Sequence, residues 1–330
     1  MRLLAGRYRT LLTLGAILVV VAVLMWVLSP DRFLSGPNLQ SMAYQIPILG
    51  LFSLAMAVAM ITGGINLSII SSAIVSGVAG ALLLKSLVHA GMGAFQMTAA
   101  VTAAILVILG ISVIIGALNG LIIGYAKVPA VLGSLATMTM LQGLAIGITK
   151  GGAVSGFPEA FQFIGLGVVG GVPLAFVLFL LFAVLLSLLL NRTPWGFSIY
   201  MIGSNERATL YSGINNRAIL LRTYVLSGLL SGVAATIMTS QFDSIKASYG
   251  SAYLLQSILV ALLGGVSASG GQGTVSGVVI GILILQCFSS GFNILGFSTF
   301  LTTAIWGLML ILAMVVSFVR ERSVQTPSIV

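Results

Sequence analysis

Long apolar runs separated by short polar stretches dominate the chain. A helix needs about 20 apolar residues to cross the hydrocarbon core of a bilayer. The runs are continuous rather than alternating, which favours helices over a transmembrane β-barrel. The pattern therefore predicts an all-α integral membrane protein with about ten spans. The predicted spans cover residues 11–29, 43–62, 67–86, 97–125, 128–149, 172–190, 219–240, 252–268, 274–292 and 299–319.

Two of these runs allow more than one interpretation. Residues 97–125 are long for one upright helix, so the span is tilted, bent at Gly110 or Gly116, or split in two, which would change the topology. The run 11–29 follows a basic segment, as in a signal peptide, but no small-residue cleavage site precedes Pro30. We interpret this run as a retained first helix.

The composition supports a lipid environment. Hydrophobic residues make up 59% of the 330 residues and charged residues only 6%, and the mean hydropathy is +1.19. A water-soluble globule does not bury so large an apolar fraction. The 40 glycines suit closely packed or interrupted membrane helices. We predict a single transmembrane domain over residues 1–330, in contact with membrane lipid.

The charged residues predict the orientation, because cytoplasmic loops retain Lys and Arg. Ten crossings place both termini and the loop 191–218 on one side. These segments carry Arg2, Arg7, Arg9, Arg192, Arg207, Arg217, Arg320 and Arg322, and Arg222 follows the loop at the start of the next span. The opposite loops carry the mixed groups Asp31 with Arg32, Lys85 with His89, Lys150 with Glu159, and Asp243 with Lys246. We predict a multi-pass protein of a bacterial inner membrane with cytoplasmic termini. The net charge of +9 forms no basic stripe, which argues against a nucleic-acid partner.

Few residues offer chemistry of their own. Cys287 is the single cysteine, so a disulfide within the chain and a thiolate metal site are excluded. His89 follows a predicted span, where a solvated loop histidine is expected. The absence of a P-loop motif excludes ATP binding by that route. No Asp or Glu lies deep in a span, which disfavours ion-coupled transport and intramembrane catalysis. We expect no catalytic residue, no metal and no cofactor on this chain.

Two segments about 200 residues apart share the same order of features. The pair Gly63-Gly64 ends an apolar run and precedes a Ser-containing stretch and another run, and Gly264-Gly265 does the same. Transporters build central pathways from repeated halves with interrupted helices. Chance repetition among glycine-rich helices is the alternative.

The loop 191–218 contains a candidate helix. Asn205 can cap it, Glu206 lies in its first turn, and Gly213 can end it. We predict about two helical turns over residues 205–214 on the cytoplasmic face. From these residues alone, an ordinary interfacial helix and a docking element are equally compatible.

Three motifs, in order, resemble those of a known family. Residues 203–214 are similar to the pattern Gly-Gly-Asn-Glu-Ala-Ala-Arg-Leu-Ser-Gly-Ile in the coupling loop of monosaccharide permeases of ATP-binding-cassette importers, the ribose, xylose and galactose type. Residues 62–68 resemble its Ser-Gly-Gly-Ile-Asp-Leu-Ser, and residues 261–277 its Val-Leu-Gly-Gly-x-Ser-x-x-Gly-Gly-x-Gly. Shorter matches occur at 119–120, 127–129 and 293–296, so the resemblance covers nearly the whole chain.

Four positions depart from the family pattern. Asn66 replaces an Asp and Ile70 a Gly, while Arg207 and Tyr211 alter the coupling loop. The lost charge at position 66 indicates either an altered substrate or one of two unequal permeases. An identical homodimer therefore does not follow from the resemblance.

The resemblance implies a permease subunit that pairs with a second copy or a homologous permease. Two ATPase subunits, which hold the ATP and Mg, would bind from the cytoplasm, and a periplasmic binding protein would deliver substrate. The residues assigned to ATPase coupling are Gly203, Asn205, Glu206, Arg207, Ala208, Leu210, Ser212, Gly213 and Ile214. Those assigned to the pathway or its gating are Gly63, Gly64, Asn66, Ser68, Asn119, Gln256, Gly264 and Gly265.

The expected substrate is a small neutral sugar or sugar-like solute, because the candidate pathway offers hydrogen-bonding groups without fixed charge. Thr137, Gln142 and Ser257 add to these groups. Two alternatives stay open. Related permeases carry nucleosides or branched-chain amino acids, and a stand-alone secondary transporter would need no ATPase.

Overall fold

The structure is a computed structural model that describes residues 2–89 and 91–325, with side chains for 10–89 and 91–316. Within this part of the chain, nine helices are long and apolar enough to span a membrane. They are α1 (Arg2–Leu28), α3 (Gly36–Ile61), α4 (Ile69–Leu87), α5 (Ala94–Gly124), α6 (Ala130–Thr149), α8 (Leu174–Arg192), α11 (Asn216–Gln241), α13 (Val275–Ile294) and α14 (Thr299–Gln325). The predicted all-α membrane class is confirmed.

Shorter elements connect the spans. The helices among them are α2 (Pro30–Phe33), α7 (Glu159–Leu166), α9 (Pro194–Ser204), α10 (Glu206–Tyr211) and α12 (Ser251–Leu263). Four two-residue strands form two antiparallel pairs, β1 (Val154–Ser155) with β4 (Ser244–Ile245) and β2 (Val168–Val169) with β3 (Val172–Pro173).

The predicted span 252–268 is corrected. Helix α12 ends at Leu263, and its 13 residues cover about 20 Å, less than the roughly 30 Å hydrocarbon core. The apolar run continues beyond Leu263, but Gly265 adopts a φ of +81°, which a helix cannot continue through. The apolar run therefore predicted a longer helix than the one in the structure.

Helix α5 settles the open interpretation of residues 97–125. It is one continuous helix of 31 residues, about 46 Å long. Neither Gly110 nor Gly116 breaks it. Residues 97–125 therefore count as one span, and the described part of the chain has nine long spans together with the short apolar helix α12.

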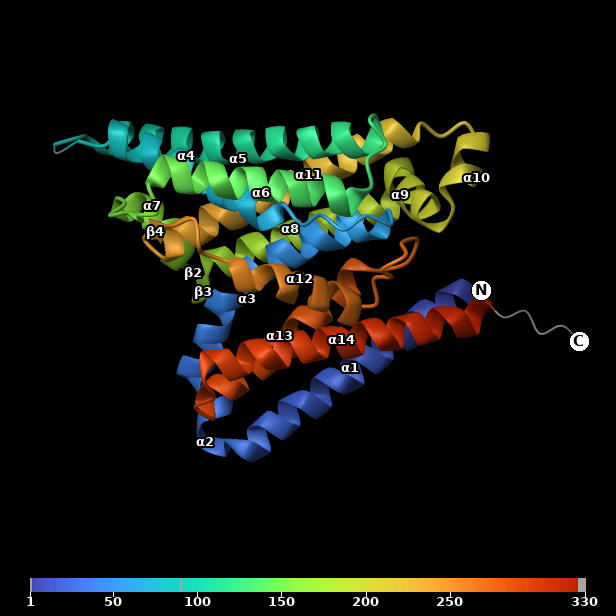
Figure 1. Cartoon of the computed structure of the whole chain (residues 1–330). Helices are drawn as coiled ribbons and strands as arrows, with labels where there is room; N and C mark the ends of the chain where they lie inside the picture. Colours follow the sequence, from blue (N-terminus) through green and yellow to red (C-terminus); the bar gives the residue numbers. More distant parts are fainter. Residues whose placement is uncertain (1, 90, 326–330) are drawn as a thin grey trace, which may run out of the picture.

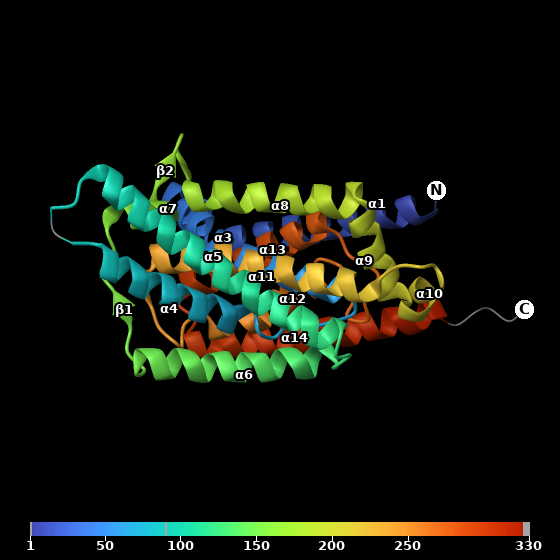
Figure 2. The same cartoon turned by 90° about the horizontal axis from the view of Figure 1, so that it is seen from above.

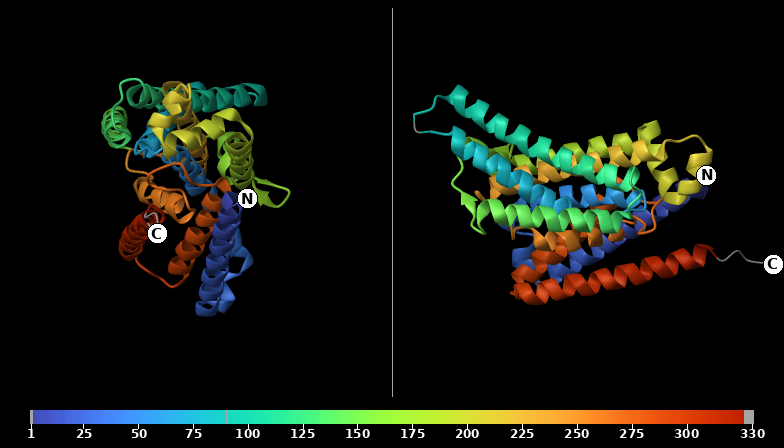
Figure 3. Two further views of the ribbon diagram at one scale, coloured as in Figure 1. Left: turned by 90° about the vertical axis from the view of Figure 1, so that its right-hand side faces the viewer. Right: turned by 45° about the horizontal axis from the view of Figure 1, so that its top comes forward.

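The helices run roughly along one axis and form two groups (Figure 1). One group holds α4, α5, α6, α8 and α11; the other holds α1, α13 and α14, with α12 between them. The left panel of Figure 3 shows the same separation, whereas the two groups overlap in Figure 2, which views the bundle from above. The first turn of α1 and the last turn of α14 lie at the same end as α9 and α10, which we call the α10 end. The outer ends of α1 and α14 therefore lie beside the loop 191–218, as the predicted topology requires, while the side of the membrane stays a prediction.

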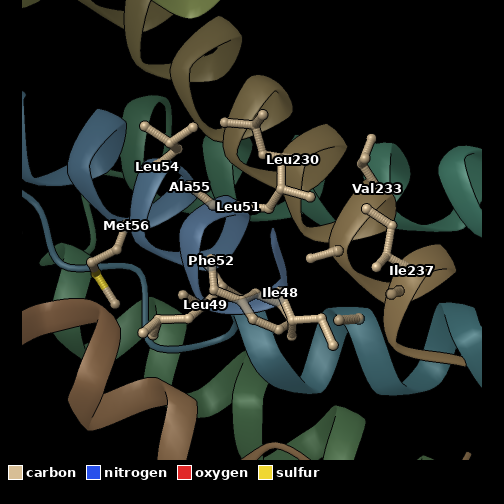
Figure 4. Close-up of a cluster of buried hydrophobic side chains, with 14 of the residues drawn as sticks. Ile48, Leu49, Leu51, Phe52, Leu54, Ala55, Met56, Leu230, Val233 and Ile237 are labelled. Atoms are coloured by element: carbon tan, nitrogen blue, oxygen red, sulfur yellow. The ribbon is translucent and has the colours of Figure 1, made fainter. Parts of the chain in front are cut away.

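Helix α3 occupies the centre of the bundle. Pro47 lies inside it, where a missing N–H interrupts the backbone ladder, and the helix changes direction along its length in Figure 1. Beyond Pro47 nearly every side chain is buried. Phe52 and Leu54 lie in this half, and the core cluster includes Leu230 and Ile237 of α11 (Figure 4). This contact fixes α11, which leads directly out of the loop 191–218.

Helices α5 and α11 make the most extensive contact in the bundle, through small residues. A methyl group on Gly116 would overlap the backbone oxygen of Tyr224, and one on Gly228 would overlap that of Ser112. Small residues allow such close backbone approach between membrane helices. Gly116 thus serves packing, not bending.

Charge is distributed unequally between the two ends. By their place in the chain, ten basic and two acidic residues belong to the α10 end, a net charge of +8. Four basic and three acidic residues belong to the opposite end, a net charge of +1. The excess of Lys and Arg at one end is the pattern on which the predicted orientation depends.

Candidate functional site

The candidate coupling helix forms as the sequence predicts, but it is shorter. Asn205 caps α10, with its side-chain oxygen accepting a hydrogen bond from the backbone N–H of Ala208 at 3.0 Å. The helix ends after Tyr211, not at Ile214. Gly213, at a φ of +77°, stops it, and the N–H of Ile214 donates to the carbonyl of Thr209 at 3.1 Å. This paired closure is a Schellman motif, which requires a residue with positive φ at Gly213.

Most of α10 faces outward. Thr209 is buried, whereas Leu210 is exposed and Tyr211 is 93% exposed. The other assigned coupling residues with exposed side chains are Asn205, Glu206, Arg207, Ala208 and Ser212, while Ile214 is half-buried. A short capped helix with an exposed aromatic residue is a suitable contact for a partner protein.

Helix α9 was not predicted. Thr193 caps it by accepting a hydrogen bond from the Gly196 N–H at 3.1 Å, and Pro194 occupies its first turn. A Thr-Pro pair before an apolar stretch is a recognised helix start, so the signal was present. Ile199 and Ile202 are buried, which anchors α9 to the bundle. Helix α10 is therefore attached to a packed helix.

Gly203 lies at a junction of backbones, not on the coupling surface. A methyl group at Gly203 would overlap the carbonyl oxygen of Ile61 and the nitrogen of Gly271. The Gly271 N–H donates to that carbonyl at 2.8 Å. A methyl group at Gly270 would lie 2.6 Å from the nitrogen of Gly63. We call Gly63, Gly203, Gly270 and Gly271 the glycine junction; it joins α9 to the end of α3 and to the α12–α13 loop.

The repeated glycine pairs end their helices in the same way. At the end of α3, the N–H of Gly64 donates to the carbonyl of Ala59 at 3.2 Å, and Gly63 has a φ of +83°. At the end of α12, the N–H of Val266 donates to the carbonyl of Ala261 at 2.9 Å, around Gly265. Gly63 therefore corresponds to Gly265 and not to Gly264, the first glycine of the second pair.

Several assigned pathway residues form one buried polar network. Asn66 donates to the Ser227 hydroxyl at 3.0 Å and accepts from the Ser68 hydroxyl at 2.8 Å. Asn119 donates to the Ser68 hydroxyl at 2.7 Å, and Thr137 donates to the Asn119 side-chain oxygen at 2.8 Å. All five side chains are buried. The network ties the α3–α4 turn to α5, α6 and α11, and none of its buried side-chain polar atoms lacks a hydrogen-bond partner.

The remaining polar candidates lie apart from this network. Gln142 is exposed on α6, and Gln256 is half-buried on α12. Ser257 is buried, and its hydroxyl donates to the carbonyl of Leu254. Gly264 packs against Val278 of α13, where an added methyl group would lie 2.7 Å from the Val278 Cα. The structure brings together Asn66, Ser68, Asn119 and Thr137 but not the glutamines.

The network predicts a position-specific effect on α6. Replacing Thr137 by valine removes a buried donor to Asn119, so we expect the free energy of unfolding to fall by about 1 kcal/mol. Thr139→Val, two residues along the same helix, is the control, because the Thr139 hydroxyl is exposed and bonds only its own helix. Denaturant titration in detergent measures both variants. Equal stabilities would contradict this role of Thr137.

No group of three or more metal-ligating side chains occurs among the described residues. His89 is exposed in the α4–α5 connection, and Cys287 is a free, buried thiol. The buried polar side chains of the described region are all uncharged Ser, Thr, Asn or Gln. The interior therefore suits a neutral polar solute better than an ion.

Comparison with known proteins decides the family. The model of a family described as "Branched-chain amino acid transport system / permease component" matches residues 38–314. The chain belongs to this permease family. The resemblance found in its motifs is thereby confirmed.

Several relatives of this permease match over nearly their whole length. The ribose import permease protein RbsC of Bacillus subtilis is 35% identical over 311 residues, 93% of this chain and 91% of the relative. RbsC of Escherichia coli K12 is 32% identical over 309 residues, 92% of each chain. The autoinducer 2 import system permease protein LsrD of E. coli K12 is 29% identical over 316 residues, 94% and 92%. No solved structure matches the chain. The relatives are permease proteins, not enzymes.

Proposed function

We propose that the chain is the membrane-spanning permease subunit of an ATP-driven importer for a small neutral sugar or sugar-like solute. The observation that carries the proposal is the 35% identity to a ribose import permease across 93% of the chain. The uncharged buried polar groups agree with such a substrate. The chain itself would bind no nucleotide, and ATP with Mg would belong to partner ATPase subunits.

The α10 end is proposed to face the cytoplasm. Its net charge of +8, against +1 at the other end, supports this orientation. A periplasmic binding protein would then meet the end that carries α7 and the strands. A second permease, identical or homologous, would complete the complex.

Helix α10 is proposed to transmit the movement of an ATPase subunit. Movement of α10 would pass through α9 to the glycine junction and from there to the end of α3 and to the α12–α13 loop. Such rigid-body displacement of packed elements is a common gating motion. In this proposal the Asn66 network holds the α3–α4 turn in the closed arrangement.

Tyr211 provides a direct test of docking. Tyr211→Ala is expected to reduce ATPase copurification about tenfold, because exposed aromatic residues are frequent energetic anchors of interfaces. Phe95→Ala is the matched control, since Phe95 is 86% exposed but lies at the opposite end of the bundle. Affinity purification with quantitative mass spectrometry measures both. If Phe95→Ala loses the ATPase as strongly, docking at α10 is ruled out.

Uptake in proteoliposomes tests the proposed function as a whole. The permease, reconstituted with partner ATPase subunits and a binding protein from the same host, is expected to import ribose or a related sugar only when ATP is supplied on the ATPase side. Import without ATP or partners would favour a secondary transporter and overturn the proposal.

The uptake experiment should also test branched-chain amino acids as substrates, because the matched family is described by branched-chain amino acid transport. A zwitterion needs charged or strongly polar partners, whereas the buried groups here are neutral. We therefore expect labelled leucine to remain outside liposomes that import sugar. Import of leucine in place of sugar would reverse the assignment of substrate.

A further inference from the structure

A cavity of about 460 Å³ lies at the α10 end, within one permease chain. Its walls come from the α3–α4 turn, the α5–α6 connection, α10 and the first turns of α11. It is separate from the Asn66 network, none of whose members line it. A volume of this size accommodates a small metabolite.

Two cationic side chains line the cavity, and both are exposed. Lys127 lies in the α5–α6 connection with a φ of +56°, an uncommon backbone conformation for a lysine. Arg217 lies in the first turn of α11, 6.0 Å from the centre of the Tyr125 ring. Neither makes a salt bridge with another described residue. Both charges are therefore free to bind an anionic group.

Two polar atoms in the cavity wall have no partner. The hydroxyl of Tyr224, a fully buried residue, makes no hydrogen bond. A methyl group at Gly64 would lie 2.5 Å from it, so the hydroxyl faces the wall formed by that glycine. The Asn216 amide nitrogen donates to the Glu206 carbonyl at 3.0 Å, while its side-chain oxygen has no partner. Buried polar groups without partners are costly and need an explanation.

The mixture of groups defines a class of ligand. A phosphoryl group satisfies Lys127 and Arg217. Sugar hydroxyls can donate to the Asn216 oxygen and to the Glu206 carboxylate, which also lines the cavity, and can accept from Tyr224. We propose that this cavity binds a phosphorylated sugar. Inorganic phosphate would leave the Asn216 side-chain oxygen and the Glu206 carboxylate without the hydrogen-bond donors that sugar hydroxyls supply.

Binding at this place would restrain the coupling helix, because the cavity joins α10 to α11 and to the α5–α6 connection. A sugar phosphate is the product expected when a cytosolic kinase phosphorylates an imported sugar. The ligand would thereby slow further import. This regulatory step rests on the proposed function and orientation, whereas the binding itself does not.

Calorimetric titration of the full chain in lipid nanodiscs tests the site, with ribose 5-phosphate as the probe. Lys127→Gln and Arg217→Gln are each expected to weaken binding about tenfold. Tyr224→Phe removes only the buried donor and is expected to weaken it about fivefold. Lys150→Gln is the matched control, since Lys150 is also an exposed lysine with positive φ, at 52°, but at the opposite end.

The result expected is saturable binding that the three cavity variants weaken and Lys150→Gln does not. Absence of binding, or equal weakening by Lys150→Gln, would overturn the site. Equal affinity for inorganic phosphate would overturn the assignment to a sugar phosphate. ATP-driven uptake in proteoliposomes serves as the independent reference: failure of binding while uptake persists rejects only the cavity, and loss of uptake with intact binding rejects the proposed function.

Discussion

Gly203→Val is expected to lower ATP-driven uptake about a hundredfold. The valine Cβ would overlap the Ile61 carbonyl oxygen and the Gly271 nitrogen, which are joined by their own hydrogen bond of 2.8 Å. Both are backbone atoms, so no side chain can rotate away, and overpacking of this kind costs about 3 kcal/mol. Helix α9 would have to move away from the end of α3 and from the α12–α13 loop. Uptake per folded permease in proteoliposomes measures the effect.

The matched control for this substitution is Gly143→Val. Gly143 also lies inside a helix, α6, but a methyl group there meets no atom within 4 Å. Both variants add the same side chain to a helix, so a difference between them isolates the junction. Retention of the ATPase together with loss of uptake would locate the defect in transmission rather than docking. Wild-type uptake by Gly203→Val would refute the role of the glycine junction.

Gly116→Leu is expected to reduce the free energy of unfolding by about 3 kcal/mol or more. The added side chain would meet the Tyr224 backbone oxygen and the Gly228 Cα, the latter 3.2 Å from the first added carbon. Helices α5 and α11 would have to separate along their closest contact, and the dispersion energy of that contact would be lost. Thermal or denaturant unfolding of the purified protein in detergent gives the value.

Gly110→Leu provides the comparison on the same helix. No atom lies within 4 Å of a methyl group at Gly110, so the leucine points into open space. Its effect is expected within about 0.5 kcal/mol of the wild type. Equal losses in the two variants would show that α5 is sensitive to glycine replacement in general and would contradict the packing role of Gly116.

The spans were predictable because a membrane helix encodes its length in a continuous apolar run. The limits of α4 and α6 follow the predicted ranges to within two residues. The α10 cap was predictable for a similar reason: Asn205 and Gly213 act through neighbours a few residues away. Local signals of this kind can be read from the sequence alone, because all the residues that take part lie close together in the chain.

The contacts between distant segments were not predictable. Ser227 lies 161 residues from Asn66, and nothing local distinguishes it from the other serines of α11. The glycine junction unites the end of α3, the end of α9 and the α12–α13 loop through backbone atoms, which carry no sequence signature. The same holds for the cavity, whose Lys127 and Tyr224 come from different elements. Which distant residues become neighbours depends on how the helices pack against one another. A single sequence does not reveal this packing.

The unequal charge of the two ends has an energetic consequence in an energised membrane. If the α10 end faces the cytoplasm as proposed, turning the chain over would move a net seven positive charges from the negative to the positive side, given +8 and +1 at the two ends. At about 2.3 kcal/mol per charge for 100 mV, the inverted arrangement is disfavoured by about 16 kcal/mol. Removing any one arginine of the α10 end takes away only a seventh of this difference. The orientation of the permease is thus redundantly specified, and no single charge substitution is able to invert it.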